Sequence, residues 1–297
     1  MNIIDGKALA AQIRGEIKER VKNFGKTVTL AVVIAGEDPA SQIYVRNKIR
    51  ACDEAGVRSV CIRLPGNCTQ QKLEQTLSDL ANDPTINGVL LQLPLPKGLD
   101  ERAALSIIPV EKDVDGFCEE NAGKLAMNRG GIVACTPLGV MKMLQYAGVS
   151  LCGKRAVVLG RSNTVGRPMA NLLLNADATV TICHSKTQNV KELCLEADIL
   201  IAAIGKPKFV TADMVKPGAV VIDVGINRLA DGKICGDVDF ESVSKTASAI
   251  TPVPGGVGPM TIAMLLYNTV CAAEAQAEAG AHANSPDEQA KTANENR

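Results

Sequence analysis

Apolar residues recur along the first half of this 297-residue chain with two alternating periods. Residues 6–24 repeat them at helical spacing, whereas residues 29–35 form a short, almost wholly apolar run, as in a buried strand of a parallel sheet. The same patterns predict helices at 43–55 and 70–82 and strands at 59–64 and 86–92. Strand and helix alternate throughout, which indicates a parallel α/β domain.

A second alternating set begins near Thr136. It predicts helices at 136–147, 166–174 and 190–196, strands at 155–160, 179–183, 198–204 and 219–223, a hairpin turning at 230–233, and a long alanine-rich helix at 259–279. The predicted fold class is therefore α/β, with two parallel-sheet domains, the second Rossmann-like, and a cleft between them.

The expected domain boundaries follow from where the alternation restarts. We place the first domain at residues 1–137, completed by the C-terminal helix at about 268–280, and the second at residues 138–267. The polar segment 281–297 is expected to be a disordered tail.

Charge and composition exclude several classes of protein. Thirty-two basic residues balance thirty-two acidic ones, so no net field favours a nucleic acid or a membrane. No apolar run reaches the ~20 residues of a membrane span, and the N-terminus lacks an export pattern. The ten cysteines are scattered without a Cys-x-x-Cys pair, which indicates reduced thiols in a cytoplasmic protein. With two histidines and no zinc spacing, no metal site is expected.

A glycine turn between a predicted strand and a predicted helix suits a dinucleotide. Gly160 and Gly166 are the outer glycines of a G-x-G-x-x-G pattern, with Ser162 in the place of the middle one. The next strand ends in His184-Ser185-Lys186-Thr187, without the acidic residue that binds the ribose of NAD. A 2′-phosphate, and therefore NADP, is favoured; a tight βα turn and an ordinary polar turn without a ligand are the alternatives.

One face of the predicted helix at 43–55 carries residues that could act on a ligand. Tyr44 and Lys48 are four residues apart and point the same way, with Ser41 beside them. A phenol and an ammonium so placed can stack on a ligand ring and move a proton, although a solvated helix face fits the same spacing. Ser41 and Asp38 are both candidate capping residues for this helix.

Three further stretches carry groups that could bind a ligand at a strand end or in a loop. Gln92 ends a buried strand, where open α/β sheets bind ligands. Asp113 and Asp115 stand two apart in a loop, and residues 251–259 form a glycine- and proline-rich loop that exposes backbone. Taken singly, each also fits a purely structural role: a strand-end amide, turn-forming aspartates and a plain linker.

In chain order these motifs resemble one family, the bifunctional methylenetetrahydrofolate dehydrogenase and methenyltetrahydrofolate cyclohydrolase. The resemblance covers residues 1 to about 280 and rests on Ser41-x-x-Tyr44-x-x-x-Lys48, the Gln-Leu-Pro-Leu-Pro run from Gln92, Lys112-Asp-Val-Asp-Gly116, Gly160-Arg-Ser-x-x-Val-Gly-Arg-Pro168 and Pro252-Val-Pro-Gly-Gly-Val-Gly-Pro-Met-Thr261. It implies NADP-dependent oxidation of 5,10-methylenetetrahydrofolate and hydrolysis of the methenyl product to 10-formyltetrahydrofolate, a one-carbon step that feeds purine biosynthesis. The formyltetrahydrofolate synthetase activity of some relatives is not expected.

The resemblance also implies residue roles. Lys48 would transfer the proton of the hydrolytic step, Gln92 would hydrogen-bond this lysine, Tyr44 would stack on the aminobenzoyl ring and Asp115 would bind the pterin. Pro254, Gly255 and Gly256 would line the folate slot. Cofactor contacts map onto Gly160, Arg161, Ser162, Ser185 and Ile226, with Arg161 and Ser185 facing the 2′-phosphate.

A homodimer is expected by the same resemblance, through the nucleotide domain and the hairpin after Asp223. Two other functions remain open: a monofunctional NADP-dependent methylenetetrahydrofolate dehydrogenase, and a non-enzymatic nucleotide-sensing or scaffold protein. The presence of Lys48, Gln92 and Asp115 argues against the first of these.

Overall fold

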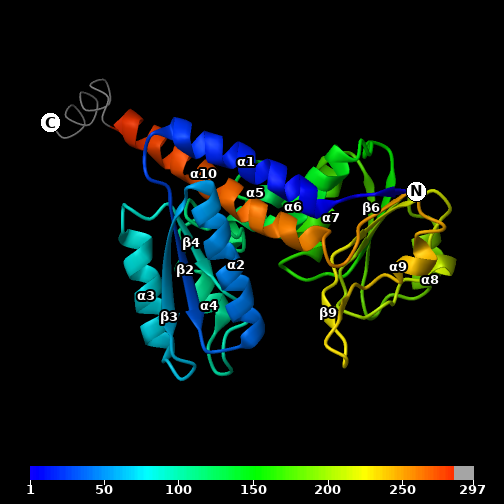
Figure 1. Cartoon of the computed structure of the whole chain (residues 1–297), viewed down its shortest axis with the longest axis horizontal. Helices are drawn as coiled ribbons and strands as arrows, with labels where there is room; N and C mark the ends of the chain where they lie inside the picture. The colour runs from blue at the N-terminus through cyan, green and yellow to red at the C-terminus, as the bar shows by residue number, and fades with distance from the viewer. Residues whose placement is uncertain (284–297) are drawn as a thin grey trace. The chain divides into compact units, whose positions relative to one another are not determined.

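The computed structural model describes residues 1–283 of the chain (Figure 1). It contains two compact units, each made of two stretches of sequence. Met1–Arg14 and Glu119–Leu265 form a unit around a six-stranded sheet, which we call the six-stranded unit. Gly15–Cys118 and the chain from Leu266 form the three-stranded unit.

The three-stranded unit is built on a short parallel sheet in the order β3-β2-β4. The central strand β2 is buried along its whole length, as its unbroken apolar run predicts. Helices α2 and α3 flank the sheet (Figure 1). The elements are β2 (Thr29–Ala35), α2 (Pro39–Ala55), β3 (Arg58–Leu64), α3 (Gln70–Asn82), β4 (Gly88–Leu91), α4 (Glu101–Leu105) and parts of α1 (Gly6–Phe24) and α10 (Val257–Ala283).

Helix α2 begins four residues earlier than its apolar period indicates. The carboxylate of Asp38 accepts the backbone N–H of Ser41 at 2.8 Å, and Pro39 supplies the fixed φ that suits a first helical residue. Asp38 is thus the capping residue, and Ser41 lies buried on the helix. The helix ends at Gly56, whose φ of +74° is left-handed, as predicted for a C-terminal glycine.

The six-stranded unit carries a parallel sheet in the order β1-β11-β8-β7-β5-β6. Its strands are β1 (Asn2–Ile3), β5 (Arg155–Leu159), β6 (Thr179–Cys183), β7 (Ile199–Ala202), β8 (Val220–Asp223) and β11 (Ala249–Ile250), beside the antiparallel hairpin of β9 (Asn227–Arg228) and β10 (Ile234–Cys235). Its helical elements are α5 (Glu119–Ala126), α6 (Cys135–Tyr146), α7 (Gly166–Asn175), α8 (Val190–Leu195), η1 (Ala212–Met214) and α9 (Phe240–Val243), with the start of α1 and of α10. The predicted α/β class with two parallel sheets is confirmed.

Several short elements carry too little periodicity to be predicted. Strands β1 and β11 are two residues long, and they extend the sheet because β1 pairs with β11 and β11 with β8. The predicted boundaries, 1–137 and 138–267, stay a prediction; the compact units differ from them at residues 1–14, 119–137 and 266–267. Of the expected tail, residues 281–283 end α10, and residues 284–297 lie outside the described part. Within residues 1–283, each helix is too short or too polar to cross a lipid bilayer.

Candidate functional site

Tyr44 and Lys48 lie one turn apart on α2, as the sequence predicts. Lys48 is 8% exposed, a rare degree of burial for a lysine, whereas Tyr44 is 38% exposed. Partial burial raises the pKa of the Tyr44 phenol above its ordinary value. The phenol is therefore un-ionised at neutral pH and remains partly accessible to solvent.

The structure brings Gln92 to Lys48. Gln92 directly follows β4, and its backbone N–H donates to the Val33 carbonyl of the central strand at 2.8 Å. Its side chain makes two hydrogen bonds. Oε1 accepts one from Lys48 Nζ at 3.1 Å, and Nε2 donates the other to the Leu93 carbonyl at 2.6 Å. Strand order changes direction at β2, with β3 on one side and β4 on the other, which is where open α/β sheets bind ligands.

The acidic loop separates its two carboxylates into different roles. Asp113 is buried and accepts the backbone N–H groups of Gly116, Phe117 and Cys118 at 3.2, 3.1 and 2.9 Å. Asp113 therefore shapes the loop, in which Asp115 is half-buried.

Lys112, beside Asp113, is a structural lysine. Its Nζ donates to the Ala81 and Asp83 carbonyls at 2.8 and 2.7 Å, which ties the acidic loop to the end of α3. Burial lowers the pKa of Lys112 below its ordinary value.

In the six-stranded unit, Gly160 turns the chain out of β5 at the point where strand order reverses between β6 and β7. Its φ is +116°, and a Cβ there would lie 2.1 Å from the Ala203 carbonyl oxygen. A Cβ on Gly166, the first residue of α7, would lie 2.2 Å from the Gly160 carbonyl oxygen. Both outer glycines are thus required sterically, because strand, turn and helix approach too closely for any side chain.

Ser162, in place of the middle glycine, closes this turn with its side chain. Its Oγ accepts the N–H groups of Val165 and Gly166 at 3.1 and 3.3 Å, at the start of α7. Arg161 and Ser162 are both exposed at the turn. The arrangement fits a pyrophosphate, for which backbone approach and a helix N-terminus are the usual partners.

The turn after β6 lies next to the Gly160 turn, because the last residue of β5, Leu159, pairs with the last residue of β6, Cys183. Ser185 is exposed in this turn, which carries no acidic side chain. His184 holds the turn, because its Nδ1 accepts the Lys186 N–H at 3.2 Å and its own N–H donates to Thr187 Oγ1 at 2.9 Å. A hydroxyl and cations at this edge fit a ribose 2′-phosphate better than free ribose hydroxyls.

Ile226 is 50% exposed in the segment after β8. This segment and the one after β7 are bound by two buried carboxylates, Asp223 and Asp237, which the sequence reasoning missed. The available signal was the glycine beside each of them, Gly225 and Gly236, since a carboxylate that binds backbone leaves no room for a neighbouring side chain.

The glycine-proline loop belongs to the six-stranded unit, where it packs on the start of α1. The Lys7 N–H donates to the Gly255 carbonyl at 2.9 Å, and a Cβ on Gly6 would lie 1.9 Å from the Gly256 carbonyl oxygen. Pro254 is exposed on this loop and follows a cis peptide bond. The structure thus places Pro254–Gly256 and the residues of the nucleotide turn in one unit, and Tyr44, Lys48, Gln92 and Asp115 in the other.

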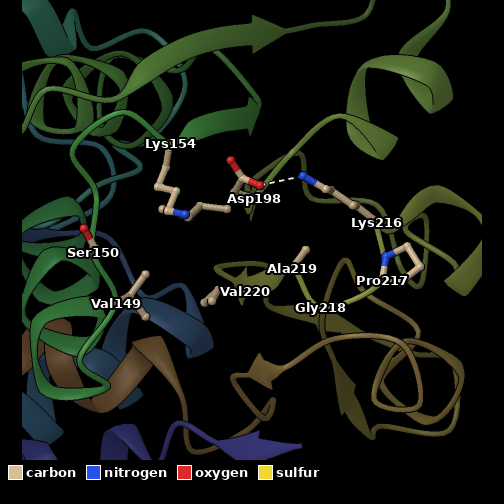
Figure 2. A pocket seen from close by; sticks show the side chains of 10 residues that line it. Val149, Ser150, Lys154, Asp198, Lys216, Pro217, Gly218, Ala219 and Val220 are labelled. Carbon is tan, nitrogen blue, oxygen red and sulfur yellow. Dashed lines mark hydrogen bonds and ion pairs between the residues drawn. The ribbon is translucent and has the colours of Figure 1, made fainter.

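A cavity of about 240 Å³ lies at the opposite, amino-terminal edge of the six-stranded sheet (Figure 2). Lys154 and Ser150 line it, together with an ion pair between Lys216 Nζ and Asp198 Oδ1 at 2.6 Å. Because its polar groups are partly paired and it lies at the edge opposite the strand ends that carry the glycine turn, this cavity is not the candidate site. Among residues 1–283, no group of three or more His, Cys, Asp or Glu side chains could hold a metal ion.

Comparisons with known proteins agree with this arrangement. Residues 4–115 match the tetrahydrofolate dehydrogenase/cyclohydrolase catalytic domain, and residues 134–277 match the NAD(P)-binding domain of the same family. The chain is 57% identical over 279 residues to the bifunctional protein FolD of Campylobacter concisus, covering 93% of this chain and 99% of that protein.

Solved structures give the same result. The Campylobacter jejuni bifunctional enzyme FolD, a methylenetetrahydrofolate dehydrogenase/cyclohydrolase, superposes with a TM-score of 0.91 at 50% identity, covering 93% of this chain and 99% of that one. The Trypanosoma brucei enzyme, solved with NADP and an inhibitor, superposes with a TM-score of 0.88 at 42% identity, covering 91% and 96%. Both domain models match within one chain, and the curated relatives are bifunctional, which favours the two-activity reading over the monofunctional alternative. The chain belongs to the tetrahydrofolate dehydrogenase/cyclohydrolase family.

Proposed function

We propose that this protein oxidises 5,10-methylenetetrahydrofolate with NADP and then hydrolyses the methenyl product to 10-formyltetrahydrofolate. The observation that carries the proposal is the hydrogen bond from the buried Lys48 Nζ to the half-buried Gln92 Oε1, 3.1 Å long, at the switch point of the three-stranded sheet. Neither a sensor nor a scaffold needs a buried amine at a ligand-binding strand end.

The oxidation needs binding and orientation from the protein. Bound NADP would supply the acceptor for the hydride that leaves the one-carbon bridge of the folate. The closely packed Gly160 turn admits the pyrophosphate, and Arg161 and Ser185 bind the 2′-phosphate, in keeping with the absence of an acid in the turn after β6. Ile226, half exposed, offers an apolar surface to the nicotinamide side.

The hydrolysis needs proton transfer. Water adds to the methenyl carbon and gives up one proton to the Lys48 amine. As the bond from that carbon to the pterin nitrogen breaks, the nitrogen gains a proton and the added hydroxyl loses its own to become the formyl oxygen. Gln92, fixed by its bond to the Leu93 carbonyl, holds the amine in place. Tyr44 stacks on the aminobenzoyl ring, and Asp115 accepts hydrogen bonds from the pterin. Pro254, Gly255 and Gly256 contribute backbone to the folate slot.

The expected form of the protein is a cytoplasmic homodimer. All ten cysteines lie in the described residues as free thiols, which suits a reducing compartment. The hairpin of β9 and β10 exposes Ile234, which is 40% accessible and suits an interface between copies. Light scattering of the purified protein tests the dimer, and cell fractionation tests the compartment.

One spectrophotometric assay tests the reaction. Methenyltetrahydrofolate should appear when the protein, 5,10-methylenetetrahydrofolate and NADP are mixed, more slowly with NAD, and should then decay. Replacing Lys48 with Met should slow the decay by at least ~100-fold while the protein stays folded. Lys72→Met, at an exposed position of α3, is the matched control and should behave as wild type. Full hydrolysis by Lys48→Met would remove this lysine from the mechanism.

A further inference from the structure

Two buried carboxylates at the carboxyl edge of the six-stranded sheet have no part in the reaction described above. Asp223 is the last residue of β8, and Asp237 follows β10; they are 3% and 0% exposed. A carboxylate buried this deeply is stable only when its oxygens are hydrogen-bonded. Their hydrogen-bond partners therefore indicate their role.

Asp237 accepts hydrogen bonds from the backbone of the segment that follows β7. Its Oδ2 accepts the N–H groups of Ile204 and Gly205 at 2.7 and 2.9 Å. Its Oδ1 accepts the N–H of Lys206 and the Nδ2 of Asn227, both at 2.8 Å. Three consecutive backbone donors and one side-chain amide therefore converge on a single carboxylate.

Asp223 fixes Asp237 in turn. Its Oδ1 accepts the N–H groups of Gly225 and Asp237, and its Oδ2 accepts that of Val238, each at 2.9 Å. A Cβ on Gly236 would lie 1.8 Å from Asp223 Oδ2, so this close approach requires a glycine. The segments after β7, β8 and β10 are thereby joined into one hydrogen-bonded network.

The network lies against the nucleotide turn. The Ala203 N–H donates to the Leu159 carbonyl at 2.8 Å, and the Ala203 carbonyl oxygen occupies the space that a Gly160 side chain would need. Residues 204–206, which continue from Ala203, are the ones bound by Asp237. Asn227, its fourth donor, directly follows Ile226.

We propose that Asp237 is a positioning residue of the dinucleotide site, holding residues 204–206 beside the Gly160 turn and, through Asn227, the segment that carries Ile226. This inference rests on the proposed use of NADP by this unit. Both Asp237 oxygens are already occupied by protein donors, so it acts on the dinucleotide through the backbone it fixes.

Asp237→Asn is the sharpest test, because it keeps the shape of the side chain and turns one acceptor into a donor that faces backbone N–H groups. The expected result is an NADP KM raised about tenfold or more, with hydrolysis of methenyltetrahydrofolate, which needs no dinucleotide, within about twofold of wild type. Asp239→Asn is the matched control: its carboxylate lies 3.7 Å from Lys208, outside the network, and the variant should keep the wild-type KM.

The possible outcomes either support or overturn the positioning role of Asp237. An unchanged NADP KM in Asp237→Asn overturns the inference. If Asp237→Asn loses hydrolysis as well and has a lowered melting temperature, the variant Asn227→Ala is tested instead, because it removes only one of the four donors to Asp237. A several-fold higher NADP KM with intact hydrolysis then supports the inference, and an unchanged one overturns it. If calorimetry detects no NADP binding to wild type, the proposed cofactor use falls, and this inference falls with it.

Discussion

Lys48 Nζ donates to Gln92 Oε1 at 3.1 Å, which joins the middle of α2 to the end of β4 in the three-stranded unit. The two residues are 44 positions apart in the sequence. The parallel sheet makes them neighbours, because β2 and β4 pair directly and α2 follows β2. This contact joins a helix face to a strand end.

Replacing Gln92 with Leu should slow hydrolysis about 10- to 100-fold, because the Lys48 amine loses the acceptor that positions it. The decay of methenyltetrahydrofolate measures the effect. Gln75→Leu is the control, since Gln75 is exposed on α3 and bonds to Asp79 one turn along. Wild-type hydrolysis by Gln92→Leu would show that the amide has no positioning role.

If the Arg161 guanidinium binds the 2′-phosphate as proposed, replacing Arg161 with Ala should raise the KM for NADP about tenfold or more and change the KM for NAD little. Initial dehydrogenase rates with both cofactors measure the two constants. Arg155→Ala is the control: Arg155 is exposed at the amino end of β5 and pairs with Glu196. Equal losses for the two cofactors would contradict the assignment.

Replacing Arg20 with Met should lower the free energy of unfolding by about 1–2 kcal/mol. Arg20 of α1 binds both carboxylate oxygens of Glu274 on α10 and lies 5.3 Å from the ring centroid of Tyr267. This bidentate pairing raises the pKa of the guanidinium. Urea denaturation measures the change.

Arg50→Met serves as its control. The Arg50–Glu54 pair is 3.6 Å long, and both side chains are more than half exposed, so its loss should cost no more than about 0.5 kcal/mol. A cost for Arg20→Met as small as this would mean that the α1–α10 pairing contributes nothing beyond an ordinary surface ion pair.

Asp223 should make stability depend on pH. Burial raises the pKa of its carboxyl from 3.8 to about 6, against the opposing effect of its three backbone N–H partners. Because the folded-state pKa is the higher one, this contribution to stability is full below pH ~4 and is lost as pH rises through about 6, a change of up to about 3 kcal/mol.

Asp223→Asn removes this titration. Its free energy of unfolding should therefore lie further below wild type at pH 4.5 than at pH 7.5, as measured by urea denaturation. Asp231→Asn, in the exposed turn of the hairpin, should follow wild type at both pH values. A constant difference between Asp223→Asn and wild type across this range would rule out the titration of Asp223.

Most regular elements could be predicted because their signals are local. The apolar run of β2, the glycine after α2 and the Gly160 turn each express a constraint within a few residues. The apolar period begins four residues after the start of α2, which is defined by Pro39 and by Asp38, one of the two predicted capping residues. Strands β1 and β11 were missed because two-residue strands exist only through their pairing.

The sequence by itself determined the α/β class, the alternating elements and the residue types at the site, because periodicity, turn chemistry and motif spacing are written along the chain. Only the tertiary structure decided which of these residues act together. It paired Lys48 with Gln92, made Asp113 a loop-shaping residue beside Asp115, and joined Asp223 and Asp237 to the segments after β7 and β8. These contacts depend on how strands pair and on where buried donors find acceptors, and neither is encoded at any single position.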